Sequence, residues 1–247
     1  MSEDSFVVLN EKSTYPLIIT AEHASNFVPD EYNNLGLNND ELSRHIARDK
    51  GVREIVEIMA KKLNCFSIMG KYSRLLIDLN RRETEKELIL EISDGTIIPS
   101  NQNVDAQEKE KRLNKYYRNY YQKIGNQINY LKSIGKKPLI FSIHSYTPQL
   151  KGGDYRPWNA GVLYHKSTNL ADFMYKKLQN TDKIVGENVP YDLRKYNTGA
   201  VILCGEEKGL DYALIEIRDD EFDDLKKGAE YWGDILTEIL KEYLVCG

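Results

Sequence analysis

The sequence is poor in cysteine, and the few that it has form no pattern. Its three cysteines, Cys65, Cys204 and Cys246, are odd in number and far apart, and no CxxC pair occurs. Such spacing does not indicate a disulfide framework. We therefore expect reduced thiols in a cytoplasmic protein, with Cys65 as a core residue.

The sequence also lacks a strong excess of one charge and any long apolar run. Its formal net charge is −4, with both signs mixed along the chain, which argues against nucleic-acid or membrane-surface binding. Paired lysines at 61–62, 136–137 and 226–227 fall at expected helix ends or surfaces, as solvated charge. No apolar run approaches transmembrane length, and residues 1–10 are acidic, unlike a signal peptide. The composition gives no information on oligomeric state.

The 247 residues are expected to form one α/β domain over the whole chain, residues 1–247. Short apolar runs alternate with longer amphipathic stretches, which predicts a three-layer fold: a mostly parallel or mixed sheet with helices on both faces. The expected strands are 17–21, 65–69, 74–79, 139–143, 161–165 and 212–217. The expected helices are 40–63, with a possible break near Gly51, then 105–132, 170–178 (capped by Thr168 or Asn169) and 225–243.

Polar residues follow or close several of these apolar runs. His144 follows the run 139–143, Glu22 and His23 follow 17–21, and Glu216 closes the last strand. Carboxyl ends of parallel strands meet at one edge of a sheet, where open α/β sheets bind their ligands. Two imidazoles with nearby carboxylates are typical of a catalytic zinc site. The sequence therefore predicts a metal-dependent hydrolase.

Each of these residues also has a purely structural interpretation. A histidine at a strand end can simply bond a neighbour, and Glu216 or Arg218 could form an ion pair at the sheet edge. Asn80 and Arg81 could close a turn against Asp78. Such explanations are weaker for His23, His144 and Glu216, because three residues suited to a metal site would all have to occur at strand ends by coincidence.

Three motifs resemble those of the zinc carboxypeptidase superfamily. They are the His-Ser-Tyr of residues 144–146, the Asp-x-Asn-Arg of residues 78–81 and the Glu-x-Arg-Asp of residues 216–219. The sequence is more closely similar to the N-formylglutamate amidohydrolase family. It shares with that family an early histidine after the first strand, the Ser-Arg-x-x-x-Asp-x-Asn-Arg block of residues 73–81 and the Asn-x-Pro-Tyr loop of residues 188–191.

The resemblance implies a zinc-dependent amidohydrolase with a phosphorylase/hydrolase-like fold. By their positions in the motifs, His23 and His144 match metal ligands, and Glu216 matches the carboxylate that acts as general base. The remaining matches concern the substrate. Arg74 lies near the position of a carbonyl-polarising arginine, Asn80 and Arg81 match a pair that binds a substrate carboxylate, and Ser145, Asn188 and Tyr191 are further candidate substrate contacts.

The sequence departs from the superfamily at the third metal ligand. Carboxypeptidases bind zinc with His-x-x-Glu, whereas the segment that begins at His23 has Asn26 in the fourth place. Asp49 aligns with an acidic residue of the formylglutamate enzymes and is the expected third ligand, with Glu22 as the alternative. Asp49 could equally be an acidic residue near a helix start.

The expected substrate is a small carboxylate, namely an N-formyl or other small N-acyl amino acid such as N-formylglutamate. Two alternatives remain open at this point. One is a zinc carboxypeptidase or a deacylase that acts on a larger acyl or peptide substrate. The other is a binding protein that retains the fold without a metal.

Overall fold

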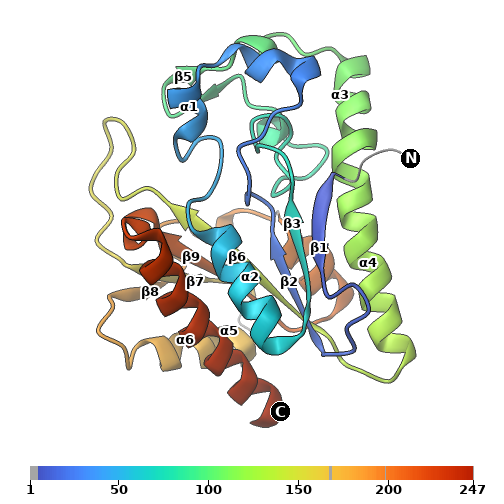
Figure 1. The fold of residues 1–247 in the computed structure, drawn as a ribbon, viewed down its shortest axis with the longest axis vertical. Coiled ribbons are helices and arrows are strands. Elements are labelled where there is room, and N and C mark those ends of the chain that lie inside the picture. Colours follow the sequence, from blue (N-terminus) through green and yellow to red (C-terminus); the bar gives the residue numbers. More distant parts are fainter. Residues whose placement is uncertain (1–4, 167–168, 198, 247) are drawn as a thin grey trace.

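A seven-stranded sheet runs through the centre of the protein in the computed structural model, which describes residues 5–166, 169–197 and 199–246 (Figure 1). The strand order is β1-β3-β2-β6-β9-β7-β8. Strands β3, β2, β6 and β9 are parallel neighbours, whereas β1 and β7 pair antiparallel with β3 and β9. The bounds are β1 Phe6–Leu9, β2 Leu17–Ala21, β3 Phe66–Gly70, β6 Leu139–Tyr146, β7 Ala160–Leu163, β8 Val185–Glu187 and β9 Tyr212–Arg218. The predicted mixed sheet is confirmed.

Helices cover both faces of this sheet. Alternate residues of a strand point to opposite faces, and neighbouring β2 residues accordingly belong to different cores. Ile19 packs in the core beneath α2 (Val52–Leu63), α5 (Asn169–Leu178) and α6 (Leu225–Cys246), whereas Ile18 packs in the core beneath α4 (Arg118–Ser133). The predicted three-layer α/β architecture is therefore confirmed. No helix in the described ranges is long and apolar enough to cross a membrane.

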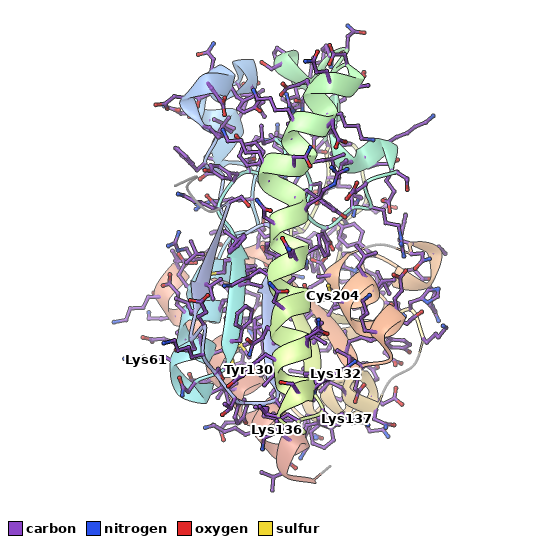
Figure 2. The ribbon with its side chains drawn as sticks, turned by 90° about the vertical axis from the view of Figure 1, so that its right-hand side faces the viewer. Lys61, Tyr130, Lys132, Lys136, Lys137 and Cys204 are labelled. Atoms are coloured by element: carbon purple, nitrogen blue, oxygen red, sulfur yellow. The ribbon has the colours of Figure 1, made fainter. Side chains whose placement is uncertain are left out.

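The predicted helix over 105–132 is one continuous helical segment in three parts. α3 (Ala106–Arg112) passes through a π-helical turn at Leu113–Tyr117 into α4. Apolar and tyrosine residues at helical spacing form its buried face, at Leu113, Tyr117, Tyr120, Ile124, Ile128 and Leu131. Figure 2 shows Lys132, Lys136 and Lys137 at the lower end of this segment, where all three are exposed. Lys136 and Lys137 precede β6 and thus lie at the amino edge of the sheet.

The predicted strand 74–79 is wrong. The segment is folded into turns, although Leu75, Leu76 and Ile77 are buried. At its start the backbone is bonded locally: the N–H of Leu75 donates to Ser73 Oγ, which in turn donates to the Ala47 carbonyl. A short apolar run cannot by itself distinguish a strand from a buried turn.

Other element boundaries differ from expectation. The predicted helix 40–63 is interrupted over eight residues, because α1 (Asn39–Ser43) ends well before α2 begins after Gly51. The short strands β1 and β8 were not predicted, and neither was the hairpin of β4 (Ile92–Ser93) and β5 (Thr96–Ile97), which lies beside α1 (Figure 1). The suggested cap Thr168 and the thiol of Cys246 lie outside the described part. Cys65 and Cys204 are buried free thiols.

Candidate metal centre and substrate cavity

A cavity of about 450 Å³ opens at the carboxyl edge of the sheet, beside the ends of β2, β6 and β9. The parallel pairing of β6 with both β2 and β9 accounts for its position, because it brings residues 23, 144 and 216 together. Nine of the ten predicted site residues line it: His23, Asp49, Arg74, Asn80, Arg81, His144, Ser145, Tyr191 and Glu216. Asn188 does not.

Two imidazoles converge on one carboxylate in this cavity. Nδ1 of His144 lies 2.8 Å from Asp49 Oδ2, and Nδ1 of His23 lies 3.4 Å from the same oxygen. One ligand atom from each residue lies within 4.8 Å of the other two, and all three side chains are buried. The backbone fixes Asp49 here, because its N–H donates to the His23 carbonyl at 3.0 Å. Two nitrogens and an oxygen at this spacing could hold a metal ion.

The outer nitrogens of both rings face further carboxylates. Nε2 of His23 lies 2.7 Å from Asp78 Oδ1, and Nε2 of His144 lies 2.9 Å from Glu22 Oε2. The second contact has ion-pair distance but not hydrogen-bond alignment. Histidines that bind metals usually have such a carboxylate behind them, which fixes the ring and the tautomer. Glu22 therefore lies behind His144, and the grouping of donors favours Asp49 over Glu22 as the third ligand.

Burial and charge oppose each other at this centre. Burial raises the pKa of the Asp49 carboxyl, but the two imidazoles outweigh it and hold that pKa below its usual range. Asp78 behaves in the same way. Burial raises the pKa of its carboxyl, but Arg74 and His23 outweigh burial and hold that pKa well below its usual range. For His144 burial lowers the pKa, whereas Asp49 and Glu22 raise it to about 10. The low pKa values of Asp49 and Asp78 favour ionised carboxylates, which a bound cation would stabilise.

Arg74 lies beside these carboxylates at the cavity wall. Its Nη2 donates to Asp78 Oδ2 at 2.8 Å, and its Nη1 lies 3.7 Å from Asp49 Oδ1. The guanidinium is therefore held near the metal-binding group with part of its surface facing the cavity. A fixed donor in this place could stabilise negative charge that develops on a bound substrate.

Glu216 differs from the other buried carboxylates because it lacks a strong partner. It pairs in register with His144 across β6 and β9, and its Oε2 is buried without a hydrogen bond to any described residue. Burial raises the pKa of this carboxyl to about 7, with His144 opposing and Asp49 adding to the shift. Such a carboxylate can take up a proton near neutral pH, as a general base must.

The ion-pair interpretation applies to Arg218 rather than to Glu216. Arg218 Nε donates to Asp220 at 2.7 Å, and its Nη1 donates to the carbonyl of Pro157 at 2.9 Å. This arginine therefore fastens the end of β9 to the loop before β7. Glu216, two residues before Arg218 and on the same face of the strand, is left facing the cavity.

Asn80 and Arg81 lie in a turn that is built on Asp78. Asn80 N donates to Asp78 Oδ1 at 2.8 Å, and Arg81 Nη1 donates to the Asn80 carbonyl at 3.0 Å. Arg81 Nε lies 3.8 Å from Glu85 Oε2. The turn interpretation is thus correct for the backbone, while both side chains also line the cavity.

The three remaining candidate substrate contacts are placed differently from one another. Ser145 Oγ donates to the Lys50 carbonyl at 2.9 Å, and the hydroxyl of Tyr191 accepts from Arg156 Nη1 at 3.2 Å. Asn188 is buried, and its side-chain oxygen accepts from the backbone N–H groups of Tyr164 and Leu193. These bonds make Asn188 a support of the loop that carries Tyr191, away from the cavity surface.

Several residues of the site did not stand out in the sequence. The carboxylate of Asp78 lies behind His23, yet in the motif it was considered only as a turn partner. Other unpredicted residues also line the cavity, and these are Glu85, Glu87, Leu163, Leu193, Tyr196 and Leu214. No local pattern marks these six, because they come from four separate segments of the chain.

The fold and the site define an α/β protein with a candidate metal centre and a ligand cavity at the carboxyl edge of a mixed sheet. A model of the N-formylglutamate amidohydrolase family matches residues 15–222, and the chain belongs to that family. Membership supports an activity that hydrolyses an amide bond.

Two solved structures have the same fold. The gene product Atu2144 from Agrobacterium tumefaciens is 27% identical, with a TM-score of 0.93 over 99% of this chain and 96% of that one. The N-formylglutamate amidohydrolase from Ralstonia eutropha JMP134 is 19% identical, with a TM-score of 0.72 over 98% of each chain. Among curated proteins, none matches.

Proposed function

We propose that the protein is a zinc-dependent amidohydrolase that removes a formyl or other small acyl group from an N-acyl amino acid. The observation that carries this proposal is the position of Glu216. Its buried, unpartnered carboxylate shares one cavity with the His23, Asp49 and His144 group. Family membership supports the same class of reaction.

His23, Asp49 and His144 would hold the zinc ion, with their ligand atoms already within 4.8 Å of one another. A zinc ion bound there would lower the pKa of water to about 7 and stabilise negative charge. Asp78 and Glu22 would keep the two rings oriented through their Nε2 atoms.

The other residues of the cavity would handle the proton and the substrate. Glu216 would accept the proton of the attacking water at its free oxygen and return it to the leaving amine. Arg74 would donate to the oxygen of the cleaved amide as negative charge develops there. Arg81, with its planar set of donors, would bind the α-carboxylate bidentately, and Asn80 would add one bond.

Formate release tests this proposal. The zinc-loaded protein is assayed with a panel of N-formyl amino acids, N-acetyl amino acids and dipeptides. We expect formate or acetate release with at least one N-acyl amino acid and none with the Glu216→Gln variant. Release of amino acids from dipeptides alone would indicate a carboxypeptidase. A protein that binds no zinc and cleaves none of these compounds would be a binding protein, contrary to the proposal.

A further inference from the structure

Arg156 lies beside the cavity without a carboxylate partner. It is a half-buried residue of the loop between β6 and β7, and in the described ranges it forms no ion pair. Its Nη1 donates to the hydroxyl of Tyr191 at 3.2 Å and to the carbonyl of Thr147 at 3.4 Å. The guanidinium also lies over the rings of Tyr146 and Tyr191, 5.9 and 5.1 Å from their centroids. The partners of this cation are therefore neutral groups, and they centre on Tyr191.

The backbone holds Arg156 in place independently of its side chain. Its N–H donates to the Pro148 carbonyl at 2.8 Å, and its carbonyl accepts from Arg218 Nη1 at 3.2 Å. Tyr191 is held as well, because its ring meets that of Tyr146 edge to face at a centroid distance of 6.5 Å. A change in the side chain of Arg156 should therefore leave the loop and the ring of Tyr191 near their present places.

The contact with Arg156 sets the direction of the Tyr191 hydroxyl proton. A guanidinium can only donate, so the phenolic oxygen accepts this bond and its own proton must point elsewhere. No described residue accepts that proton. Tyr191 lines the cavity and is 37% exposed, so the proton is available to a bound ligand.

The hydroxyl lies near the reacting end of the cavity. Tyr191 shares the cavity lining with Arg74 and Glu216. Burial raises the pKa of the Tyr191 hydroxyl, Glu216 adds to this shift, and the charges of Arg156 and Arg74 oppose it. Such effects of charge require proximity. The hydroxyl therefore stays protonated at neutral pH and lies in the same part of the cavity as the donor Arg74.

We propose that Arg156 is a positioning residue, which orients Tyr191 so that the hydroxyl donates to the acyl oxygen of the bound substrate. Arg156 acts only through Tyr191, whereas Tyr191 itself contacts the substrate. Together with Arg74, Tyr191 would supply a second donor to the oxygen on which negative charge develops. This inference rests on the proposed function and adds two residues to the site that carries it out.

A double-mutant cycle tests the inference through kinetics. We would measure kcat and KM for N-formylglutamate in Arg156→Gln, in Tyr191→Phe and in the variant with both changes. We expect kcat to fall roughly a hundredfold in Tyr191→Phe, as for loss of one donor to a developing oxyanion, and roughly tenfold in Arg156→Gln, with a smaller change in KM. The double variant should be no slower than Tyr191→Phe, because Arg156 acts through a hydroxyl that is already absent. Arg156→Lys keeps a charged donor and should recover part of the loss.

The same cycle in binding requires no turnover. The Kd of N-formylglutamate is measured by calorimetry in zinc-loaded Glu216→Gln, with the two changes added singly and together. Tyr191→Phe should weaken binding roughly fivefold and Arg156→Gln roughly threefold, as for loss of one hydrogen bond, and the two losses should not add. The control is Arg194→Gln, because Arg194 belongs to the same segment as Tyr191 but bonds Asp192 at 2.7 Å outside the cavity. This control should leave kcat and Kd unchanged.

The outcomes separate this inference from the proposed function. Losses that add in binding or in kcat, or no saturable binding of N-formylglutamate, would overturn the inference. Formate release by the native enzyme would in that case leave the amidohydrolase proposal intact. Conversely, non-additive losses in binding, without hydrolysis of any N-acyl amino acid by the native enzyme, would uphold the placement of Tyr191 and contradict the proposed reaction.

Discussion

The two histidines of the centre are each backed by a buried acid, and Glu22 is the one whose role the sequence left open. Its Oε2 lies 2.9 Å from Nε2 of His144, and the carboxylate accepts hydrogen bonds from Tyr120 at 3.1 Å and Ser142 at 3.0 Å. It is therefore fully enclosed and cannot face the cavity. Motif spacing could indicate that His144 is a ligand. It could not indicate which ring nitrogen faces the metal-binding group, because the ring is oriented by side chains from other parts of the chain.

We predict that Glu22→Gln weakens zinc binding by about 10- to 100-fold, as expected for loss of an outer carboxylate. A chelator competition titration measures the affinity. The matched control is Glu206→Gln, because Glu206 also lies against a histidine, His165 at 2.9 Å, outside the cavity. An equal loss of zinc affinity in both variants would show that general destabilisation of the protein, rather than loss of the carboxylate behind His144, weakens zinc binding.

Glu216 gives a prediction for stability against pH. Its folded-state pKa is raised to about 7 by burial from an ordinary value near 4.5. The folded state therefore binds one more proton between these values, so stability is lost as pH rises through about 7. The loss is at most on the order of 3 kcal/mol. In metal-free protein, Glu216→Gln should be more stabilising at pH 8 than at pH 5.

Urea unfolding at both pH values checks this, with exposed Glu91→Gln as control. The same gain for Glu216→Gln at pH 5 and pH 8 would contradict the assigned pKa.

Arg81 gives a prediction for substrate binding. We expect Arg81→Lys to raise KM for N-acyl amino acids roughly tenfold with little change in kcat, because an ammonium cannot bind a carboxylate bidentately. The control is Arg82→Lys, because Arg82 points away from the cavity to Asn197 and Glu207. Steady-state kinetics compares the two variants. An unchanged KM for Arg81→Lys would show that Arg81 does not bind the substrate carboxylate.

At the scale of elements, the sequence predicted best where a run was long and strongly apolar. The central strands β2, β6 and β9 were recognised because they are continuous apolar runs. The helical segment α3–α4 was recognised because its buried residues recur at helical spacing. The segment 74–79 was misjudged because its apolar residues are buried in turns. Short β1 and β8 carry too few residues to show a period.

The close approach of β3 to β2 gives a prediction at this scale. A Cβ on Gly70 would lie 2.2 Å from the backbone oxygen of Glu22, next to His23. We expect Gly70→Ala to destabilise the protein by about 1–3 kcal/mol and to weaken zinc binding, because the backbone beside His23 must shift. Thermal unfolding and the zinc titration measure both effects.

Gly125 provides the control for Gly70. It lies inside α4, and a Cβ there would meet no atom within 4 Å. Gly125→Ala should stabilise the protein by about 0.5–1 kcal/mol through helix propensity and leave zinc binding unchanged. A neutral Gly70→Ala would mean that the two strands are less tightly packed than described.

At the scale of the whole molecule, the site depends on sheet order. β6 lies between β2 and β9, which brings together residues that are more than a hundred positions apart in sequence. Strand ends and motifs were enough to name nine of the cavity residues. The balance of charge in the cavity could not be predicted, because Glu85 and Glu87 reach it from a turn that no periodic pattern marks.

The central claim is that His23, Asp49 and His144 hold one metal ion beside Glu216. Zinc content after loading and exhaustive dialysis tests it most directly, with folding checked by circular dichroism. We predict one zinc per chain in the native protein and in Glu216→Gln, and less than about a tenth of that in folded His144→Ala. Full zinc content in His144→Ala, or none in the native protein, would contradict the account.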